Sequence, residues 1–283
     1  MKVSVFTTYT NPEIRKDPWI EATNCYKDFA DELIVTGSDW SYEFSWDEIG
    51  KQFQKGFDES SGDWVFRMDI DYFIHEKDFN KIYYYLKKYS NFPAISMPQY
   101  QFFTPGKYSI KTRLCIALNK KWFPDIKLNG GGDLCLATLN NTLLSPINTP
   151  NIEIPIYQYD SIFRTKEIIS EDRARFSRAW YKYFSDYGDR GGPDPDSAYK
   201  AWYEMVKKKI PSHIHNIKID NHPKYIVEKL KNIESNQFGY NAFGLSDIEN
   251  QSLNHFLKGY KEKYLNRHIL NLKRAISKQT NFS

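Results

Sequence analysis

A short apolar segment that runs directly into two aspartates most constrains how this chain can fold. Residues 64–68 (WVFRM) form a nearly continuous hydrophobic run of strand length, and Asp69 and Asp71 follow it. Such a run is typical of a strand covered on both faces. In open α/β sheets the ligand crevice lies at the carboxyl ends of the strands, so the pair is placed to hold a divalent cation and, through it, a diphosphate. The alternative is a strand-to-loop turn whose aspartates are solvated or cap the next helix.

Composition sets the scale of the fold. The 283 residues suit one large domain, or one domain with an appended helical part, and 41% hydrophobic with 17% aromatic residues provide a sizeable core. Cys25, Cys115 and Cys135 are odd in number and widely spaced, with no second cysteine two to four residues from any of them, which argues against a zinc knuckle or a disulfide framework. Residues 3–9 are too short and polar for a signal sequence, and no run approaches the roughly 18 apolar residues of a membrane span. We therefore expect a cytoplasmic protein.

The first half of the chain alternates strands and helices. Asp17-Pro18 is expected to cap a first helix, after which a short buried strand ends at Gly37-Ser38-Asp39. A helix is expected from about Glu76, followed by a strand over 93–103 and a turn at 104–106. Strands joined by helices of this length build a mostly parallel sheet with right-handed crossovers. The fold class expected is therefore α/β, with a catalytic domain over residues 1–160.

The second half turns helical. Residues 173–187 and 197–209 carry apolar side chains at helical spacing, and a glycine- and proline-rich connector separates them. We expect residues 161–283 to form a helical C-terminal region that belongs to the first domain or packs on it. Its last segment, 255–283, holds seven basic residues and one acid, a net charge of +6. This segment is expected to pack as a helix on its own domain, or to bind an anionic membrane or nucleic acid as a cationic amphipathic helix.

Three polar segments follow successive strands in the order and at the intervals of the GT-A fold. They are Thr7-Thr8-Tyr9, Gly37-Ser38-Asp39 and Asp69-Ile70-Asp71. The chain resembles glycosyltransferase family 2, and more specifically the small family-2-like proteins of phages and bacteria. The resemblance is best over residues 1–90, in the stretches DELIVTGSDW and DWVFRMDIDYFI. It implies transfer of a sugar from a nucleotide diphosphate sugar, with Mg²⁺ or Mn²⁺ at the Asp-x-Asp pair.

The resemblance also implies roles for the residues of these segments. Asp71 would ligate the cation, since a hard divalent ion requires anionic oxygen. Asp69 would hold the ribose hydroxyls or a metal-bound water. Asp39 would accept hydrogen bonds from the base ring, with Thr7 and Tyr9 lining the same pocket. Asp39 after Gly-Ser is equally typical of a turn.

The general base and the third metal ligand are less sharply defined. Asp133 follows three glycines where inverting members of the family carry the base, although the usual Glu-Asp doublet is absent and a helix-capping turn is the alternative. Asp125 is the second choice. Many GT-A enzymes supply a late histidine to the metal, and of the late histidines 213, 215 and 222 we expect His222. Gln158 stands where the family often carries a histidine before a tyrosine.

A basic cluster near the start of the second half has two interpretations. Its members are Arg164, Lys166, Arg173, Arg175 and Arg178. They are expected to bind a diphosphate or anionic acceptor through arginine forks, or to pair with neighbouring acids along a solvated helix face.

The function that the resemblance implies is metal-dependent transfer of a sugar from a nucleotide diphosphate sugar to a hydroxyl acceptor, with inversion at the anomeric carbon. The acceptor is a surface glycan, a lipid-linked sugar or a modified base in phage DNA, and peripheral membrane contact fits the basic tail. The enzyme would act in the cytoplasm, that of the host if the chain is of phage origin. Two other classes stay open: a non-enzymatic nucleic-acid or carbohydrate-binding protein, and a haloacid-dehalogenase-type phosphohydrolase, whose motif usually lies closer to the N-terminus.

Overall fold

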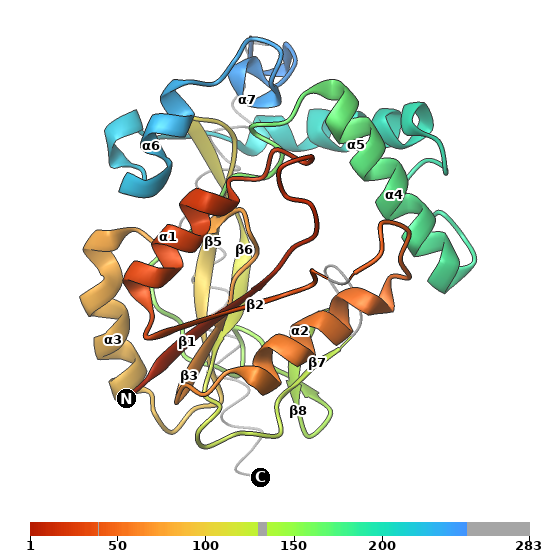
Figure 1. Cartoon of the computed structure of the whole chain (residues 1–283). Coiled ribbons are helices and arrows are strands. Elements are labelled where there is room, and N and C mark those ends of the chain that lie inside the picture. Colours follow the sequence, from red (N-terminus) through yellow and green to blue (C-terminus); the bar gives the residue numbers. More distant parts are fainter. Residues whose placement is uncertain (39, 130–134, 248–283) are drawn as a thin grey trace.

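A mixed sheet forms the centre of the molecule in the computed structural model, which describes residues 1–38, 40–129 and 135–247 (Figure 1). Within these residues the sheet has eight strands, in the order β2-β1-β3-β6-β5-β10-β4 with β11 added to β6. The strands are β1 (Val3–Thr8), β2 (Glu32–Thr36), β3 (Trp64–Arg67), β4 (Tyr72–Phe73), β5 (Ala94–Thr104), β6 (Lys107–Leu118), β10 (Ile156–Gln158) and β11 (His215–Asn216).

Most of these strands run in one direction. β1 pairs in parallel with β2 and β3, and β10 pairs in parallel with β5, whereas β6 and β4 are antiparallel to their neighbours. Trp64, Val65 and Phe66 of β3 are 2% exposed or less, because the sheet is covered on both faces. The expected mostly parallel α/β sheet is confirmed, and the fold is GT-A-like.

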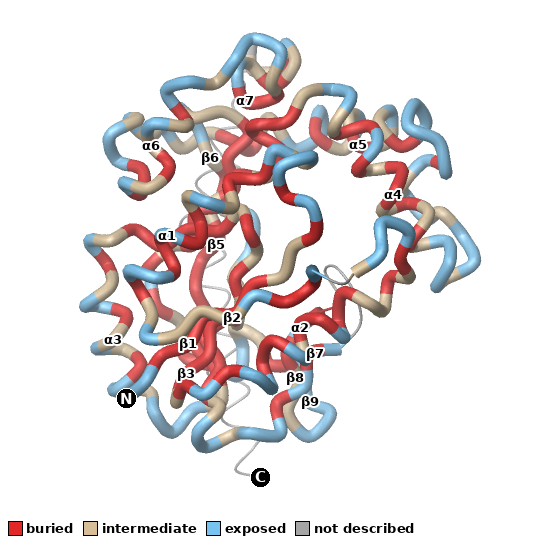
Figure 2. Tube along the Cα trace, viewed as in Figure 1, coloured by how far each residue is buried: buried red, intermediate tan, exposed pale blue. Residues whose placement is uncertain are grey.

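Helices cover the two faces of the sheet (Figures 1 and 2), and the buried side chains form separate apolar clusters. Val3 and Val5 of β1 pack with α1 (Trp19–Phe29), α3 (Phe79–Lys88) and α6 (Lys224–Lys231). Phe6, which points to the other face, packs with α2 (Asp47–Glu59). A small sheet of β7 (Lys127–Asn129), β8 (Leu136–Leu139) and β9 (Thr142–Leu143) borders the α2 side.

The remaining helices form a third apolar cluster. It joins α4 (Lys166–Phe184), α5 (Pro195–Lys209) and α7 (Phe238–Asn241) around Trp202 and Phe238. The two helices expected over 173–187 and 197–209 are confirmed as α4 and α5. The basic segment 255–283 lies outside the described residues.

One local expectation is wrong. Asp17 does not cap α1, which begins after Pro18 without a side-chain cap. Asp17 instead is 5% exposed and accepts a hydrogen bond of 2.5 Å from Arg164. An unpaired buried carboxylate would cost more free energy than an uncapped helix end, so the ion pair with Arg164 forms in place of the cap. This contact ties the loop between β1 and α1 to the segment before α4.

Candidate active site

The Asp69-Ile70-Asp71 segment forms a turn at the carboxyl end of β3. The Tyr72 amide donates to the Asp69 carbonyl at 2.9 Å and closes the turn. From α1, the Tyr26 hydroxyl lies 2.6 Å from the carbonyl oxygen of Asp69 and 2.8 Å from that of Tyr72. A buried helix side chain therefore fixes the backbone that presents the two aspartates.

Arg67 orients the Asp69 carboxylate. Its Nη2 lies 3.0 and 2.9 Å from the two carboxylate oxygens, and its guanidinium lies 4.6 Å from the centre of the Phe53 ring. The Asp69 side chain stays 33% exposed while that of Arg67 is 11% exposed. Each Asp69 oxygen retains acceptor capacity on the solvent side, so Asp69 can receive hydroxyl groups of a ligand while Arg67 holds it.

Asp71 lies beside a third carboxylate, Asp160, from the segment that follows β10. The Tyr159 amide donates to the Asp71 carbonyl at 3.0 Å, and this pairing brings Asp160 next to Asp71. Burial raises the pKa of Asp71, and the charges of Asp160, Asp69 and Asp17 raise it further. The site therefore carries more negative charge than it can stabilise, and a cation would relieve it.

Asp160 itself is held ionised. Burial alone would raise its pKa, but Arg173 and Arg164 lower the pKa below the ordinary value. Arg173 Nη2 lies 3.4 Å from Asp160 Oδ1, and the Ser161 hydroxyl donates to the same oxygen at 2.9 Å. Asp160 was not among the residues expected from the sequence, and the signal that marks it is an acid directly after a buried strand.

The expected nucleotide pocket residues lie at the ends of β1 and β2. Thr7 is fully buried, and its hydroxyl has no hydrogen-bond partner among the described residues. Tyr9 is half-buried with its ring 6.0 Å from that of Trp19, and its amide donates to Thr36 at 3.2 Å. At Gly37, which follows β2, φ is +94° and a Cβ atom would lie 2.5 Å from the Thr8 hydroxyl, so the turn requires glycine. Asp39, two residues later, lies outside the described residues, as does Asp133.

His222 does not fit the expected role of metal ligand. It is 1% exposed, with Nδ1 2.7 Å from the Tyr159 hydroxyl and Nε2 2.9 Å from the Pro105 carbonyl. Burial lowers its pKa to about 4, so the ring is neutral. Nε2–H then donates to the carbonyl and Nδ1 accepts from the hydroxyl, which leaves neither nitrogen for a metal. His213 and His215 also pack against rings, those of Phe103 and Tyr108.

The members of the basic cluster pair with different acids in different parts of the fold. Arg164 is buried between Asp17 and Asp172, whereas Arg178 pairs with Glu43 and Glu171 near the surface. Of its members, Arg173 pairs with an acid of the site, Asp160. The cluster therefore acts mainly in ion pairs within the fold.

The groups of the site that could ligate a metal are carboxylate oxygens. Among the described residues, no three His, Cys, Asp or Glu side chains are grouped so that they could hold an ion by themselves. This composition fits Mg²⁺ or Mn²⁺, which are commonly bound by one or two carboxylates together with substrate phosphates and water.

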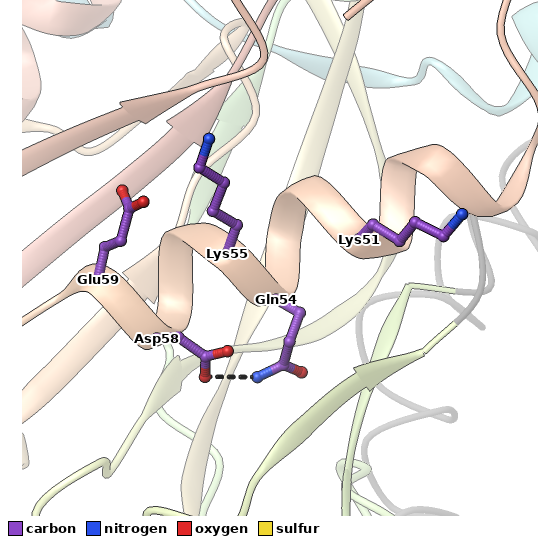
Figure 3. Close-up of a pocket in the computed structure, with 5 residues that line it drawn as sticks. All are labelled: Lys51, Gln54, Lys55, Asp58 and Glu59. Carbon is purple, nitrogen blue, oxygen red and sulfur yellow. Dashed lines mark hydrogen bonds between the residues drawn. The ribbon is translucent and has the colours of Figure 1, made fainter. Parts of the chain in front are cut away.

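A shallow hollow of about 560 Å³ lies elsewhere, on α2 (Figure 3). It is lined by Lys51, Gln54, Lys55, Asp58 and Glu59. The end of α2 lies toward the amino ends of the strands, since Ser61 donates to Glu32 at the start of β2. The hollow thus runs along α2 toward the opposite end of the sheet from the aspartates. No helix in the described part of the chain has the length and apolar character needed to cross a membrane.

Comparison with known proteins finds similarity only to solved structures. No family model and no curated protein matches the chain. A crystal structure of S. aureus TarS matches 74% of this chain and 44% of its own, with 10% identity and a TM-score of 0.35. S. aureus TarS 1-349 in complex with UDP-GlcNAc matches 74% of this chain and 73% of its own, with 12% identity and a TM-score of 0.35. The chain thus spans less than half of the longer TarS chain, and similarity this low does not assign a family.

Proposed function

We propose that this protein is a metal-dependent glycosyltransferase that moves a sugar from a nucleotide diphosphate sugar to a hydroxyl acceptor. The observation that carries the proposal is that Asp69 and Asp160 lie close enough to Asp71 to raise its pKa, in addition to burial, at the carboxyl ends of β3 and β10 in a GT-A-like sheet. Ligands of open α/β sheets bind at this end, and the charge repulsion within the group favours a bound cation.

Asp71, with Asp69, would hold Mn²⁺ or Mg²⁺, and the donor diphosphate would complete the coordination. When bound, the ion neutralises the charge that develops on the leaving diphosphate. Asp69 would accept from the ribose hydroxyls, because Arg67 fixes its orientation and leaves it a third exposed. Thr7, Tyr9 and Asp39 would line the pocket for the nucleoside.

Asp133 would act as the general base of an inverting reaction, with the exposed Asp125 as the second candidate. In this proposal residues 1–160 bind the donor, and the region 161–283 with its basic tail contacts the acceptor. The acceptor is a surface glycan, a lipid-linked sugar or a DNA base, and the enzyme acts in the cytoplasm. A phosphohydrolase is less well supported, since the Asp-x-Asp motif of that class usually lies closer to the N-terminus than residue 69.

Release of nucleoside diphosphate from a panel of nucleotide sugars tests this proposal. With Mn²⁺ present and water as a slow acceptor, we expect one donor to be cleaved, and Asp71→Asn to abolish the cleavage. Release of phosphate from simple monoesters, with no cleavage of any nucleotide sugar, would contradict it.

A further inference from the structure

Three buried side chains on adjacent strands connect the two aspartates. They are Gln99 of β5, Gln158 of β10 and Tyr72 of β4, and they are 1%, 7% and 5% exposed. β10 lies between the other two strands, with Gln158 directly opposite Tyr72. Buried amides need hydrogen-bond partners, and these find them in one another and in the site.

The hydrogen bonds form a continuous chain. Gln158 Nε2 donates to Asp71 Oδ2 at 3.2 Å, and Gln158 Oε1 accepts from Gln99 Nε2 at 2.8 Å. Gln99 Nε2 also donates to the Tyr72 hydroxyl at 2.9 Å. Burial raises the pKa of the Tyr72 hydroxyl, and the nearby charge of Asp69 raises it further, so the hydroxyl lies within reach of the Asp69 carboxylate.

The Asp71 end fixes the direction of every bond. When Asp71 is ionised its carboxylate can only accept, so Gln158 must turn its amino group to Asp71 and its oxygen to Gln99. Gln99 must then present its own amino group, and the Tyr72 hydroxyl is left to donate to Asp69. Gln99 Oε1 remains buried without a hydrogen-bond partner among the described residues, so this orientation leaves a polar atom unsatisfied.

We propose that Gln99, Gln158 and Tyr72 are positioning residues that set the spacing and orientation of the two carboxylates for the metal-bound diphosphate. The inference rests on the proposed function and deepens it. The three side chains do not ligate the ion; they restrain the groups that do, and loss of such partners typically weakens metal affinity by about 10- to 100-fold.

A double-mutant comparison tests this proposal. Gln99→Leu and Gln158→Leu are each expected to weaken Mn²⁺-dependent binding of a nucleoside diphosphate by about 10-fold. The double variant should be no weaker than the worse single variant, because either change breaks the same chain. Tyr72→Phe removes one hydroxyl, keeps the packing of the ring and should weaken binding in the same direction, so the test survives if a leucine variant fails to fold. Gln52→Leu on α2, a buried glutamine that bonds to Glu48, is the matched control and should bind as the wild type.

The outcomes separate the two proposals. If the wild type shows no Mn²⁺-dependent binding, the proposed function fails and this inference with it. If the wild type binds and the folded variants bind equally well, or if the losses of the two leucine variants add, the positioning role alone is overturned.

Discussion

Arg67 Nη2 contacts both carboxylate oxygens of Asp69, at 3.0 and 2.9 Å, across one intervening residue. Arg67 is the last residue of β3, and burial against Phe53 keeps it in place. Arg67 at the end of β3 therefore orients the first aspartate of the pair, Asp69, while Gln158 of β10 bonds to the second, Asp71.

Replacing Arg67 by methionine should free the Asp69 side chain. We expect Mn²⁺-dependent affinity for a nucleoside diphosphate to fall by about 10-fold, because Asp69 would lose the partner that orients it. Titration calorimetry measures the change. Arg178→Met removes an arginine that pairs with Glu43 and Glu171, and should leave affinity unchanged. Equal affinity in the Arg67 variant would show that the contact between Arg67 and Asp69 has no part in binding.

The metal-free protein should lose stability as the pH rises. Burial and like charges raise the pKa of Asp71 from 3.8 to about 7, so between these values the folded state retains a proton that the unfolded state has lost. The free energy of unfolding then falls as the pH rises through this window. Thermal unfolding from pH 5 to pH 8 measures it, and added Mn²⁺ should reduce the slope.

The variant Asp71→Asn has no proton to lose at this position. Its melting temperature should therefore depend less on pH than that of the wild type, and at pH 8 it should be at least as stable without metal. A wild-type slope that persists in Asp71→Asn would assign the titration to another group.

His222 should prove structural. His222→Phe leaves the Tyr159 hydroxyl and the Pro105 carbonyl without their partner, which should lower the free energy of unfolding by about 1–3 kcal/mol. Mn²⁺-dependent nucleotide binding should persist in the folded fraction. Denaturant unfolding and calorimetry measure the two effects, and a stable variant that no longer binds Mn²⁺ would restore His222 as a ligand.

The strand that precedes Asp69 and Asp71 could be predicted from the sequence, since the hydrophobic run and the two aspartates lie within ten residues of one another. Asp160 could not be predicted as their neighbour, because its approach depends on the pairing of β10 with β4. The family resemblance suggests His222 as a metal ligand, but the sequence does not show that the fold buries this ring between Tyr159 and Pro105. Helix α2 was not expected, as its two glycines lower helix propensity. Gly56 is needed for packing, since a Cβ atom there would lie 2.5 Å from the Phe6 ring.

Asp133→Asn should lower turnover far more than donor affinity. A general base acts in the transition state and typically contributes about 10²–10⁴-fold. Single-turnover kinetics with donor and acceptor measure the effect, and Asp125→Asn serves as the comparison. Normal turnover in the Asp133 variant, with a loss in the Asp125 variant, would transfer the role to Asp125.

The most direct test of a metal-dependent nucleotide site is the thermal unfolding of the wild type and Asp71→Asn, each with nucleoside diphosphates and with or without Mn²⁺. A ligand at 100 times its dissociation constant adds about 2.7 kcal/mol to the free energy of unfolding. We predict this stabilisation for the wild type only when one of the diphosphates and Mn²⁺ are both present, and none for Asp71→Asn. Stabilisation that needs no cation, or that Asp71→Asn retains, would contradict the account.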